Sequence, residues 1–275
     1  MIKPKISALI IARNEELMID NCINSVKWCD EIIVIDSGST DKTREIAESY
    51  GAKVISFKHK SFSRLRNEAL KRATLDWVIY IDADERVTPT LAKEIMVNIE
   101  TSDASVFRLS RENIHLGKKF LWGGWQNDSI ERVFKRDVLA GWFGDIHESP
   151  NYKGKLIDLK TKLIHLTHRS TAEGLIKSGN WTPIEAKELF KAGIPSVTFL
   201  TLLRKGFMEF FRRAIVKKGY KDGNEGLFEA VIQGINRVLI YIQVWELQQN
   251  PSIKDKYTKK ENEINKLWKN EEGLK

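Results

Sequence analysis

The chain has 275 residues, of which 42% are hydrophobic and 30% charged, with 17 glycines and 6 prolines. This composition excludes a disordered, collagen-like or low-complexity protein, and the length suits one large domain or one domain with an appendage. The only cysteines are Cys22 and Cys29, which excludes a disulfide framework and a cysteine-based zinc site. A formal net charge of +8 favours contact with phosphate groups on nucleic acid, anionic lipid or a phosphorylated substrate.

The sequence gives no sign of export or of membrane insertion. Its first five residues lead directly into a strand-like segment, so we expect no signal peptide. We find no apolar run that reaches the roughly 18 to 20 residues of a membrane-spanning helix. We therefore expect a cytoplasmic protein that is not integral to a membrane.

The first part of the chain alternates strands and helices. Continuous apolar runs predict strands at 6–12, 31–36, 53–57, 77–82 and 106–111. Apolar residues at helical spacing predict helices at 15–27, 42–50, 62–73 and 89–99. Gly51 is placed to end the second helix, and Thr88 to cap the fourth. This alternation predicts an α/β fold with a mostly parallel sheet and helices on both faces.

The pattern changes after residue 112. Glycines, tryptophans and short strand-like pieces at 130–134 and 163–166 predict a mixed-sheet extension that closes a site. From residue 171 the chain is helical, and the tail after Pro251 is rich in lysine and glutamate and is expected to be solvated. We predict a first domain over 1–198, made of halves 1–112 and 113–198, and a C-terminal segment over 199–275. The helices expected after residue 171 are 183–192, capped by Thr182, then 199–216 and 226–247.

Polar residues follow three of the predicted strands. They are Arg13-Asn14-Glu15 after the first, 36–41 after the second, and Asp82-Ala83-Asp84-Glu85 after the fourth. Ligands of parallel α/β sheets bind where the strands end, so these clusters should meet at one edge of the sheet.

Asp82 and Asp84 could ligate Mg²⁺ or Mn²⁺ through hard carboxylate oxygens, and an acidic turn exposed to solvent is the alternative. Asp36 could accept hydrogen bonds from a nucleotide base or ribose, whereas Asp41 reads better as a helix cap. The chain lacks G-x-G-x-x-G and G-x-x-x-x-G-K-[ST], so neither dinucleotide binding of the Rossmann type nor a P-loop is expected. A bound diphosphate would then need a metal ion.

The segments SALIIARNEE, DEIIVIDSGSTDKTREIAESYGA, RNEAL and DWVIYIDADERV together resemble the family-2 glycosyltransferases of GT-A fold. More narrowly, the chain resembles the bacterial subgroup that adds sugars to lipopolysaccharide core and related glycans. GGWQNDSIERVFKR, DIHE and GYKDGNEGL extend the resemblance through most of the sequence. It implies an inverting hexosyltransferase that uses a nucleotide sugar, with a UDP-sugar as the favoured donor, together with Mg²⁺ or Mn²⁺ and a glycan or glycolipid acceptor.

The resemblance also implies which residues form the site. Asp82, Asp84 and His165 would hold the metal, with His147 as a competitor of His165 and a structural histidine as the alternative. Many relatives have two acids where this chain has Asp36-Ser37, which leaves the uracil contact open. A helix-packing role for Asn67 and a surface role for Arg132 are also open. The implied nucleotide-sugar contacts are Ala12, Arg13, Asn14, Glu15, Asp36, Ser37, Arg66, Asn67, Asp82, Ala83, Asp84 and Arg132.

An inverting transfer needs one carboxylate to take the proton from the acceptor hydroxyl. Asp128 falls where the family's base-bearing acidic motif is expected, and Asp145 and Glu148 are the alternatives. The nearby tryptophans Trp122, Trp125 and Trp142 could stack on sugars or simply pack in the core.

Residues 204–221 combine seven lysines and arginines with large apolar side chains. This pattern is typical of a helix on a membrane surface and predicts a peripheral position at the cytoplasmic leaflet; a helical hairpin docked on the first domain is the alternative. A non-catalytic membrane-surface scaffold of the same fold and a nucleotidyltransferase are the rival functions. A nucleic-acid partner is not expected, because the strand ends are acidic where nucleic acid would need cations.

Overall fold

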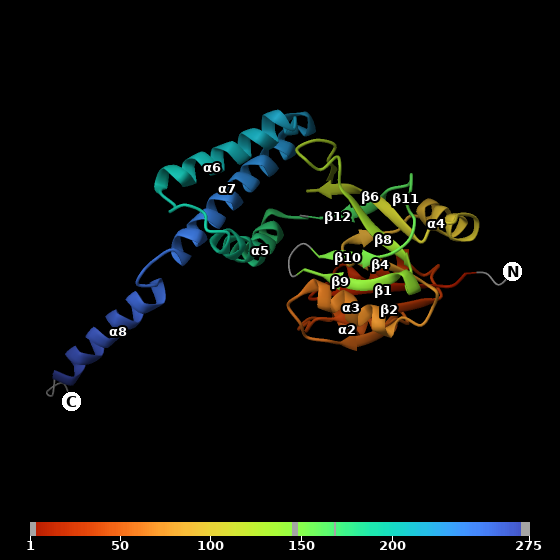
Figure 1. Cartoon of the computed structure of the whole chain (residues 1–275), viewed down its shortest axis with the longest axis horizontal. Coiled ribbons are helices and arrows are strands. Elements are labelled where there is room, and N and C mark those ends of the chain that lie inside the picture. Colours follow the sequence, from red (N-terminus) through yellow and green to blue (C-terminus); the bar gives the residue numbers. More distant parts are fainter. Residues whose placement is uncertain (1–3, 145–147, 168, 271–275) are drawn as a thin grey trace. The chain divides into compact units, whose positions relative to one another are not determined.

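The computed structural model describes residues 4–144, 148–167 and 169–270, and it divides into two compact units (Figure 1). The sheet unit comprises Met1–Leu121 and Trp125–Arg169, and the helical unit comprises Trp122–Gly124 and Ser170–Lys275. By contacts, the sheet unit therefore ends at Arg169. The domain boundary predicted after residue 198 stays a prediction.

Twelve strands are found in the described part of the sheet unit, and ten of them form one sheet. The strands are β1 (Ile6–Ala12), β2 (Glu31–Asp36), β3 (Lys53–Ser56), β4 (Trp77–Asp82), β5 (Glu85–Arg86), β6 (Val106–His115), β7 (Lys118–Lys119), β8 (Ser129–Lys135), β9 (Leu139–Phe143), β10 (Ser149–Tyr152), β11 (Leu156–Asp158) and β12 (Leu163–Leu166). The main path of the sheet is β3-β2-β1-β4-β8-β6-β12-β5, with β7 and β11 also paired to β6.

The order of these strands explains the mixed character of the sheet. β1 pairs in parallel with β2 and with β4, and β2 pairs in parallel with β3. β8 runs antiparallel to its neighbours β4 and β6, whereas β12 is parallel to β6. The carboxyl ends of β1, β2 and β4 therefore lie at one edge of the sheet, as predicted.

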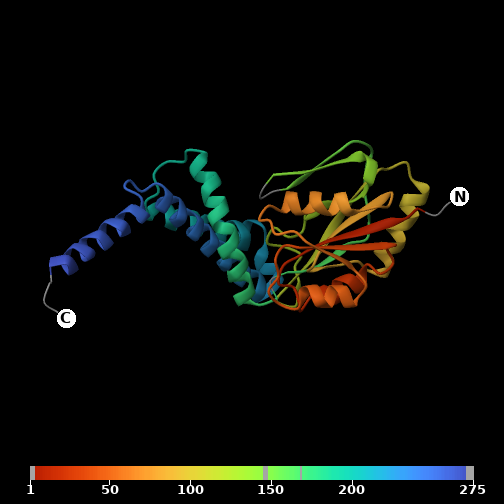
Figure 2. The same ribbon diagram turned by 90° about the horizontal axis from the view of Figure 1, so that it is seen from below.

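Helices cover both faces of this sheet (Figure 2). They are α1 (Ile19–Ser25), α2 (Thr43–Ser49), α3 (Phe62–Arg72) and α4 (Pro89–Thr101), and a short 3₁₀ turn, η1 (Arg136–Val138), precedes β9. Alternate side chains of β1 point to opposite faces, so Ile10 packs in the core formed with α1, α2 and α4, whereas Leu9 packs in the core formed with α3 and β9. Both cores exclude water from the strands, which accounts for their continuous apolar runs.

The predicted bounds of several of the first elements are confirmed, but β6 continues to His115, whereas the fifth strand was predicted to end at residue 111. β1, β2 and β4 begin and end where the apolar runs predict, Gly51 has the left-handed φ of +82°, and Thr88 caps α4 by accepting from the backbone of Leu91. The first helix begins at Ile19 and not at Glu15, which was wrong. The backbone N–H of Glu15 donates to the hydroxyl of Thr43 at 2.7 Å, so this residue belongs to a turn that joins two loops.

The helical unit contains four long helices in the described chain. They are α5 (Thr171–Lys191), α6 (Phe199–Phe211), α7 (Gly223–Leu247) and α8 (Ile253–Asn270), with a π-helical turn, η2 (Arg212–Val216), and a 3₁₀ turn, η3 (Gly219–Asp222). α6 and α7 approach closely at Gly206, where an added Cβ would lie only 2.5 Å from the side chain of Val238. Another flank of α7 packs on α5 through Ala186, Tyr241 and Val244.

The predicted start of the helix at Pro183 was wrong. α5 begins at Thr171, where the hydroxyl of Ser170 accepts from the backbone of Glu173, and Pro183 lies inside the helix. Thr182, expected to be the cap, is buried and accepts a hydrogen bond from Gln243 of α7. Proline removes one backbone donor from a helix, and this loss is tolerated in a helix held by its neighbours.

Among the residues that the structure describes, one helical segment, 219–247, is long and apolar enough to cross a membrane, with a mean hydropathy of 1.3 in its most apolar stretch. The expectation that no stretch reaches this length was therefore wrong. A single such helix is weak evidence for a membrane span, because a core helix can have the same length and hydropathy.

Candidate functional site

The loops after β1 and β2 are joined by hydrogen bonds. Asn14, in a left-handed conformation with φ of +56°, accepts from the backbone of Thr40 at 2.8 Å and donates its own N–H to the hydroxyl of Ser39 at 2.9 Å. Asp36 is buried and accepts from the backbone of Ser39 at 3.0 Å. The first two predicted polar clusters therefore come together. Ala12 and Ser37 are buried beside them, whereas Arg13 is exposed.

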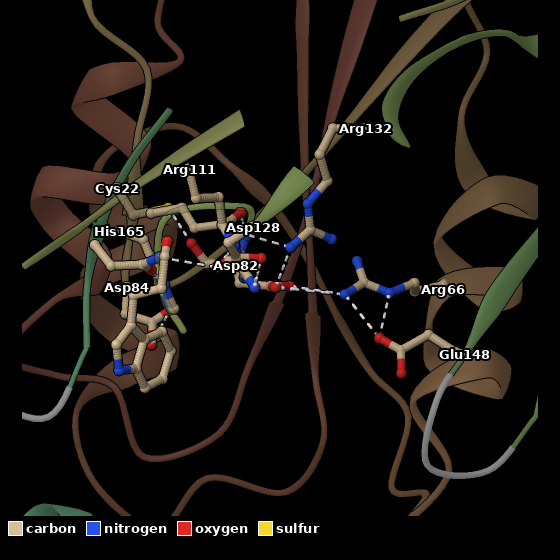
Figure 3. Close-up of polar contacts among 12 residues, drawn as sticks. Cys22, Arg66, Asp82, Asp84, Arg111, Asp128, Arg132, Glu148 and His165 are labelled. Carbon is tan, nitrogen blue, oxygen red and sulfur yellow. Dashed lines mark hydrogen bonds and ion pairs between the residues drawn. The ribbon is translucent and has the colours of Figure 1, made fainter. Parts of the chain in front are cut away.

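The end of β4 is surrounded by arginines (Figure 3). Asp82 accepts from Nη2 of Arg66 at 3.1 Å through one oxygen and from Nη2 of Arg132 through the other. Both arginines are almost completely buried. Arg132 was expected either to hold a phosphate or to lie on the surface; its guanidinium is in fact buried between carboxylates, and the surface alternative is wrong.

Glu85 is the most deeply buried charge of the site, with no solvent-exposed surface. One of its oxygens pairs with Arg132 at 2.8 Å and with Arg111 at 3.4 Å, and the other accepts from the backbone N–H of Asp82 at 3.0 Å. A buried carboxylate needs such partners to compensate for lost hydration. Glu85 therefore holds both the turn after β4, through the backbone of Asp82, and the guanidinium of Arg132.

Sheet register aligns three polar side chains on neighbouring strands. His165 of β12 is the register partner of Asn113 on β6 and of Glu85 on β5. Register partners on adjacent strands point to the same face of a sheet. Nδ1 of His165 consequently lies 2.6 Å from Oδ1 of Asn113, and its Nε2 lies 3.6 Å from Oδ2 of Asp84.

Asp128, the proposed base, lies directly before β8 and is held by β6. Arg111 binds it in a bidentate manner, with Nε to Oδ2 at 2.9 Å and Nη2 to Oδ1 at 2.8 Å. Asn113 donates a third hydrogen bond from Nδ2 to Oδ2 at 2.9 Å. Asp128 is thus joined through Asn113 to His165, and through Arg111 to Glu85.

The arginines keep the acidic groups of the site ionised. Burial alone would raise the pKa of Asp82, but the charges of Arg132 and Arg66 outweigh it and hold that pKa well below its ordinary value. Burial acts likewise on Asp128, whose pKa is lowered overall by the hydrogen bonds and charge of Arg111 and by Asn113. The pKa of Arg132 is raised by Asp82 and Glu85 despite its burial.

Asp84 and His165 have the chemistry and spacing of a divalent cation site. Two ligands of one octahedral Mg²⁺ ion lie about 3 Å apart, close to the 3.6 Å that separates Asp84 Oδ2 from His165 Nε2. Within residues 4–144, 148–167 and 169–270, no three His, Cys, Asp or Glu side chains gather as a complete metal cage. Water and substrate phosphates would supply the other ligands, as is usual for Mg²⁺. The third predicted ligand, Asp82, binds the two arginines.

The alternatives for the base differ in their surroundings. Glu148 pairs through Oε1 with Nη2 of Arg66 at 3.1 Å, so it shares that arginine with Asp82. Asp145 and His147 lie outside the described residues.

Asn67 donates to the backbone oxygen of Trp142 at 2.8 Å and accepts from its backbone N–H at 2.8 Å. These two bonds tie α3 to β9, the packing role that was left open for Asn67.

The tryptophans have separate environments. Trp142 is buried, and its ring lies 4.9 Å below the guanidinium carbon of Arg66, so it supports that arginine. Trp125 packs against the ring of His115 in the sheet unit. Trp122 belongs to the helical unit, where its backbone N–H donates to Asp222 at 2.8 Å and its ring lies beneath Lys221.

Sequence reasoning placed Glu85 in the third polar cluster without giving it a role, and it missed Arg111 and Asn113. Glu85 directly follows the D-x-D segment, and Arg111 and Asn113 alternate on one strand, so their two-residue spacing was the available signal. Their roles depend on partners from other strands, which no local pattern indicates.

Comparison with known proteins gives this geometry a context. The family model described as Glycosyl transferase family 2 matches residues 7–172. A protein of Rickettsia bellii (strain RML369-C), described as an uncharacterized glycosyltransferase, is 28% identical over 92% of this chain and 90% of its own length. The lipopolysaccharide core biosynthesis glycosyltransferase LpsC of Rhizobium meliloti (strain 1021) is 26% identical over 92% of this chain and 97% of its own.

Among solved structures, the chain resembles glucosyl-3-phosphoglycerate synthase from Mycobacterium tuberculosis, determined with Mn²⁺, UDP and glucosyl-3-phosphoglycerate. The two are 21% identical with a TM-score of 0.48, over 70% of this chain and 81% of the other.

Proposed function

Because the chain belongs to glycosyl transferase family 2, we propose that its sheet unit moves a hexose from a nucleoside-diphosphate sugar to a hydroxyl group, with inversion at the sugar. The observation that carries this proposal is the pairing of Asp84 with His165 at the end of β4, next to buried arginines. UDP is the proposed nucleotide. The proposed acceptor is lipopolysaccharide core or another bacterial surface glycan, as the similarity to LpsC suggests.

The donor would lie along the carboxyl edge of the sheet. Asp36 and the loop 12–15 would contact the base and ribose, as acids at strand ends do in related sheets. Asp84 and His165 would hold a divalent cation, Mg²⁺ or Mn²⁺, which when bound neutralises charge on the diphosphate leaving group. Nη1 of Arg66 is buried and finds no hydrogen-bond acceptor within the described chain, so it has a donor to offer a diphosphate oxygen.

Asp128 would act as the base. A carboxylate accepts about four hydrogen bonds, and Arg111 and Asn113 supply three, two of them to Oδ2. Oδ1 keeps room for an acceptor hydroxyl. As that hydroxyl oxygen bonds to the anomeric carbon, its proton passes to Asp128 and the bond from the carbon to the diphosphate oxygen breaks. The guanidinium of Arg111 holds Asp128 ionised and oriented before the transfer.

The first test is titration calorimetry with UDP, with and without Mn²⁺, on the full chain. Wild type should bind UDP more tightly with Mn²⁺, and Asp84→Ala should lose this difference. Asp103→Ala is the matched control, because Asp103 pairs with Lys155 on an exposed surface of the same unit. Equal UDP affinity with and without Mn²⁺ in the wild type would contradict the proposal that a divalent cation takes part in donor binding. If no nucleotide bound at all, the proposal of a glycosyltransferase site would be contradicted.

A bilayer surface is the proposed location of the acceptor, and α6 carries the observation for it. Phe199, Leu203, Phe207 and Phe211 recur every four residues and are all exposed, from 45% to 75%. Positions four apart lie on one face of a helix. A large apolar stripe left open to solvent marks a binding surface.

α7 adds a second exposed stripe next to the first. The two helices run antiparallel and touch at Gly206 of α6 and Gly234 of α7. With about 100° of rotation per residue counted from these two contact points, the exposed apolar residues of both helices lie on the same side of the pair. α5 packs on the other flank of α7. The α7 stripe comprises Phe228, Val231, Ile235 and Leu239.

The positive charges beside these stripes favour a bilayer with anionic lipids as the partner of this face. Arg204, Lys218 and Lys221 are exposed on or just after α6. Lysines and arginines near a membrane each contribute about 1 kcal/mol of attraction to an anionic leaflet. We therefore propose that the face defined by the α6 and α7 stripes lies on an anionic bilayer and brings the enzyme to a lipid-linked acceptor.

Flotation of the full chain with vesicles tests this location. Binding is expected with phosphatidylglycerol vesicles at low salt, and it should weaken in Phe207→Glu but not in Tyr257→Glu, an exposed aromatic residue of α8 that lies outside the stripes. Absence of flotation at low salt would overturn the location. A dimer in the wild type that Phe207→Glu dissolves, without flotation, would assign the face to a second copy of the chain.

A further inference from the structure

We propose that Asn113 is a positioning residue that selects the tautomer of His165 and holds that ring and Asp128 in one fixed arrangement. It lies at the centre of the site, buried with 1% exposure. Its side chain contacts both the proposed cation ligand and the proposed base. The inference rests on the proposed function in one respect, because it takes His165 as a ligand of the divalent cation.

The backbone places Asn113 precisely enough for this role. It lies near the end of β6, paired in parallel with His165 of β12, and its backbone oxygen accepts from the N–H of Phe120 at 2.9 Å. The backbone N–H of Arg111, two residues earlier on the same strand, donates to the backbone oxygen of Asp128 at 2.7 Å. Both neighbours of the Asn113 side chain are therefore fixed to its own strand by main-chain hydrogen bonds.

The chemistry of the neighbours determines how the amide of Asn113 is turned. Both oxygens of Asp128 accept from the guanidinium of Arg111, at 2.9 and 2.8 Å, which holds Asp128 ionised, and an ionised carboxylate only accepts hydrogen bonds. The NH₂ group of Asn113 must therefore face Asp128, at 2.9 Å, and the same nitrogen lies 3.4 Å from the backbone oxygen of Trp125, a second acceptor. The carbonyl oxygen Oδ1 is left to face His165.

This orientation in turn determines the tautomer of His165. Oδ1 of Asn113 can only accept, so Nδ1 of His165, 2.6 Å away, must carry a proton. In the neutral ring, Nε2 then bears a lone pair, and it faces a carboxylate oxygen of Asp84 at 3.6 Å. Two acceptors that face each other repel unless a metal cation or a second ring proton lies between them. The hydrogen bond from Asn113 thus prepares the ring nitrogen that a metal needs, as outer partners of metal-binding histidines do.

Nitrogen NMR of histidine side chains tests the assignment without substrate or metal. In the wild type, at a pH high enough to keep the ring of His165 neutral, the ring, assigned through His165→Gln, should show a protonated Nδ1 and an unprotonated Nε2. Asn113→Leu removes the acceptor and should abolish this tautomer preference, whereas Asn113→Asp keeps an acceptor oxygen and should retain it. Asn98→Leu, on α4 and outside the site, is the control and should leave the signal unchanged.

Mn²⁺ affinity and turnover separate positioning from simple support of the fold. Asn113→Leu should weaken Mn²⁺ binding about 10–100-fold, the usual cost of losing such a partner. Asn113→Asp should bind Mn²⁺ nearly as wild type does but lower kcat, because it places a second carboxylate against Asp128. Unchanged tautomer and Mn²⁺ affinity in Asn113→Leu would overturn the proposal.

The two proposals fail separately. If the wild type bound no Mn²⁺, the cation of the proposed function would be lost, and the tautomer comparison alone would still decide the role of Asn113. If Mn²⁺ bound but the ring carried its proton on Nε2, Asn113 would not be the positioning residue and the proposed function would stand.

Discussion

The candidate site of the sheet unit and the face of the helical unit defined by the α6 and α7 stripes treat charge in opposite ways. In the sheet unit, Glu85 and Arg132 are buried against each other and against Asp82, and each charge has a fixed partner. In the helical unit, Lys218 and Lys221 are exposed beside apolar side chains that are exposed as well. The first arrangement suits chemistry that requires oriented charges in a low dielectric. The second suits a weak, salt-sensitive attraction to a surface.

The largest effect should follow loss of the base. Asp128→Asn keeps the hydrogen bond from Arg111 possible but cannot take a proton, so kcat should fall about 10²- to 10⁴-fold. Single-turnover measurements with saturating donor would report it. Glu131→Gln, on β8 near the same end of the strand, is the control. A greater loss in Glu148→Gln than in Asp128→Asn would transfer the base to Glu148.

Breaking a buried pair in the sheet unit should cost more stability than removing a charge from the helical unit. Arg132→Met leaves Glu85 buried without its main cation and should lower the free energy of unfolding by about 3–5 kcal/mol. Arg204→Met, at an exposed position of α6, should change it by no more than about 0.5 kcal/mol. Urea unfolding followed by circular dichroism measures both. Equal costs would contradict the contrast between the units.

Acid should destabilise the sheet unit. Asp82 and Asp128 have pKa values lowered by folding, so each contributes stability that is complete above the pKa of the unfolded chain, about 3.9. This stability is lost as pH falls through the lower folded pKa values. The Tm of the wild type should therefore drop from about pH 5 downward, and Asp82→Asn should show a shallower drop. Parallel curves would remove Asp82 as a source of the acid sensitivity.

The smallest effect concerns one exposed lysine. Lys218→Ala should reduce partitioning onto anionic vesicles by about fivefold at low salt, equivalent to about 1 kcal/mol. The reduction should disappear at high salt, where surface charges are screened. Centrifugation assays at two salt concentrations measure it. An equal reduction at both concentrations would mean that Lys218 acts through packing and not through charge.

The sequence predicted the sheet well because burial on both faces leaves a plain signal. β1, β2 and β4 are continuous apolar runs, and their polar ends marked the edge where Asp36 and Asp82 lie. The start of α1 failed because Glu15 makes its decisive hydrogen bond to Thr43, a residue of another loop. The start of α5 failed because packing on α7 overrides the local signal of a proline.

The site was predicted less completely, again for a physical reason. Asp84 and His165 could be named from the resemblance and do lie together, but the residues that orient them could not. Asn113 and Arg111 act through contacts across β6, β8 and β12, whose register depends on the whole sheet. A pattern read along one chain contains the spacing of these residues and not their partners.

The short segment Trp122–Gly124 has a consequence for how such proteins can be recombined. Its residues belong to the helical unit, although the chain before and after it belongs to the sheet unit. The backbone of Trp122 donates to Asp222, and the backbone of Gly123 donates to the oxygen of Lys217. A chimaera made by a single crossover after Arg169 would therefore pair this segment with the helical unit of another protein, in place of its own Asp222 and Lys217. A functional exchange of C-terminal halves between relatives requires the three residues to be exchanged with them.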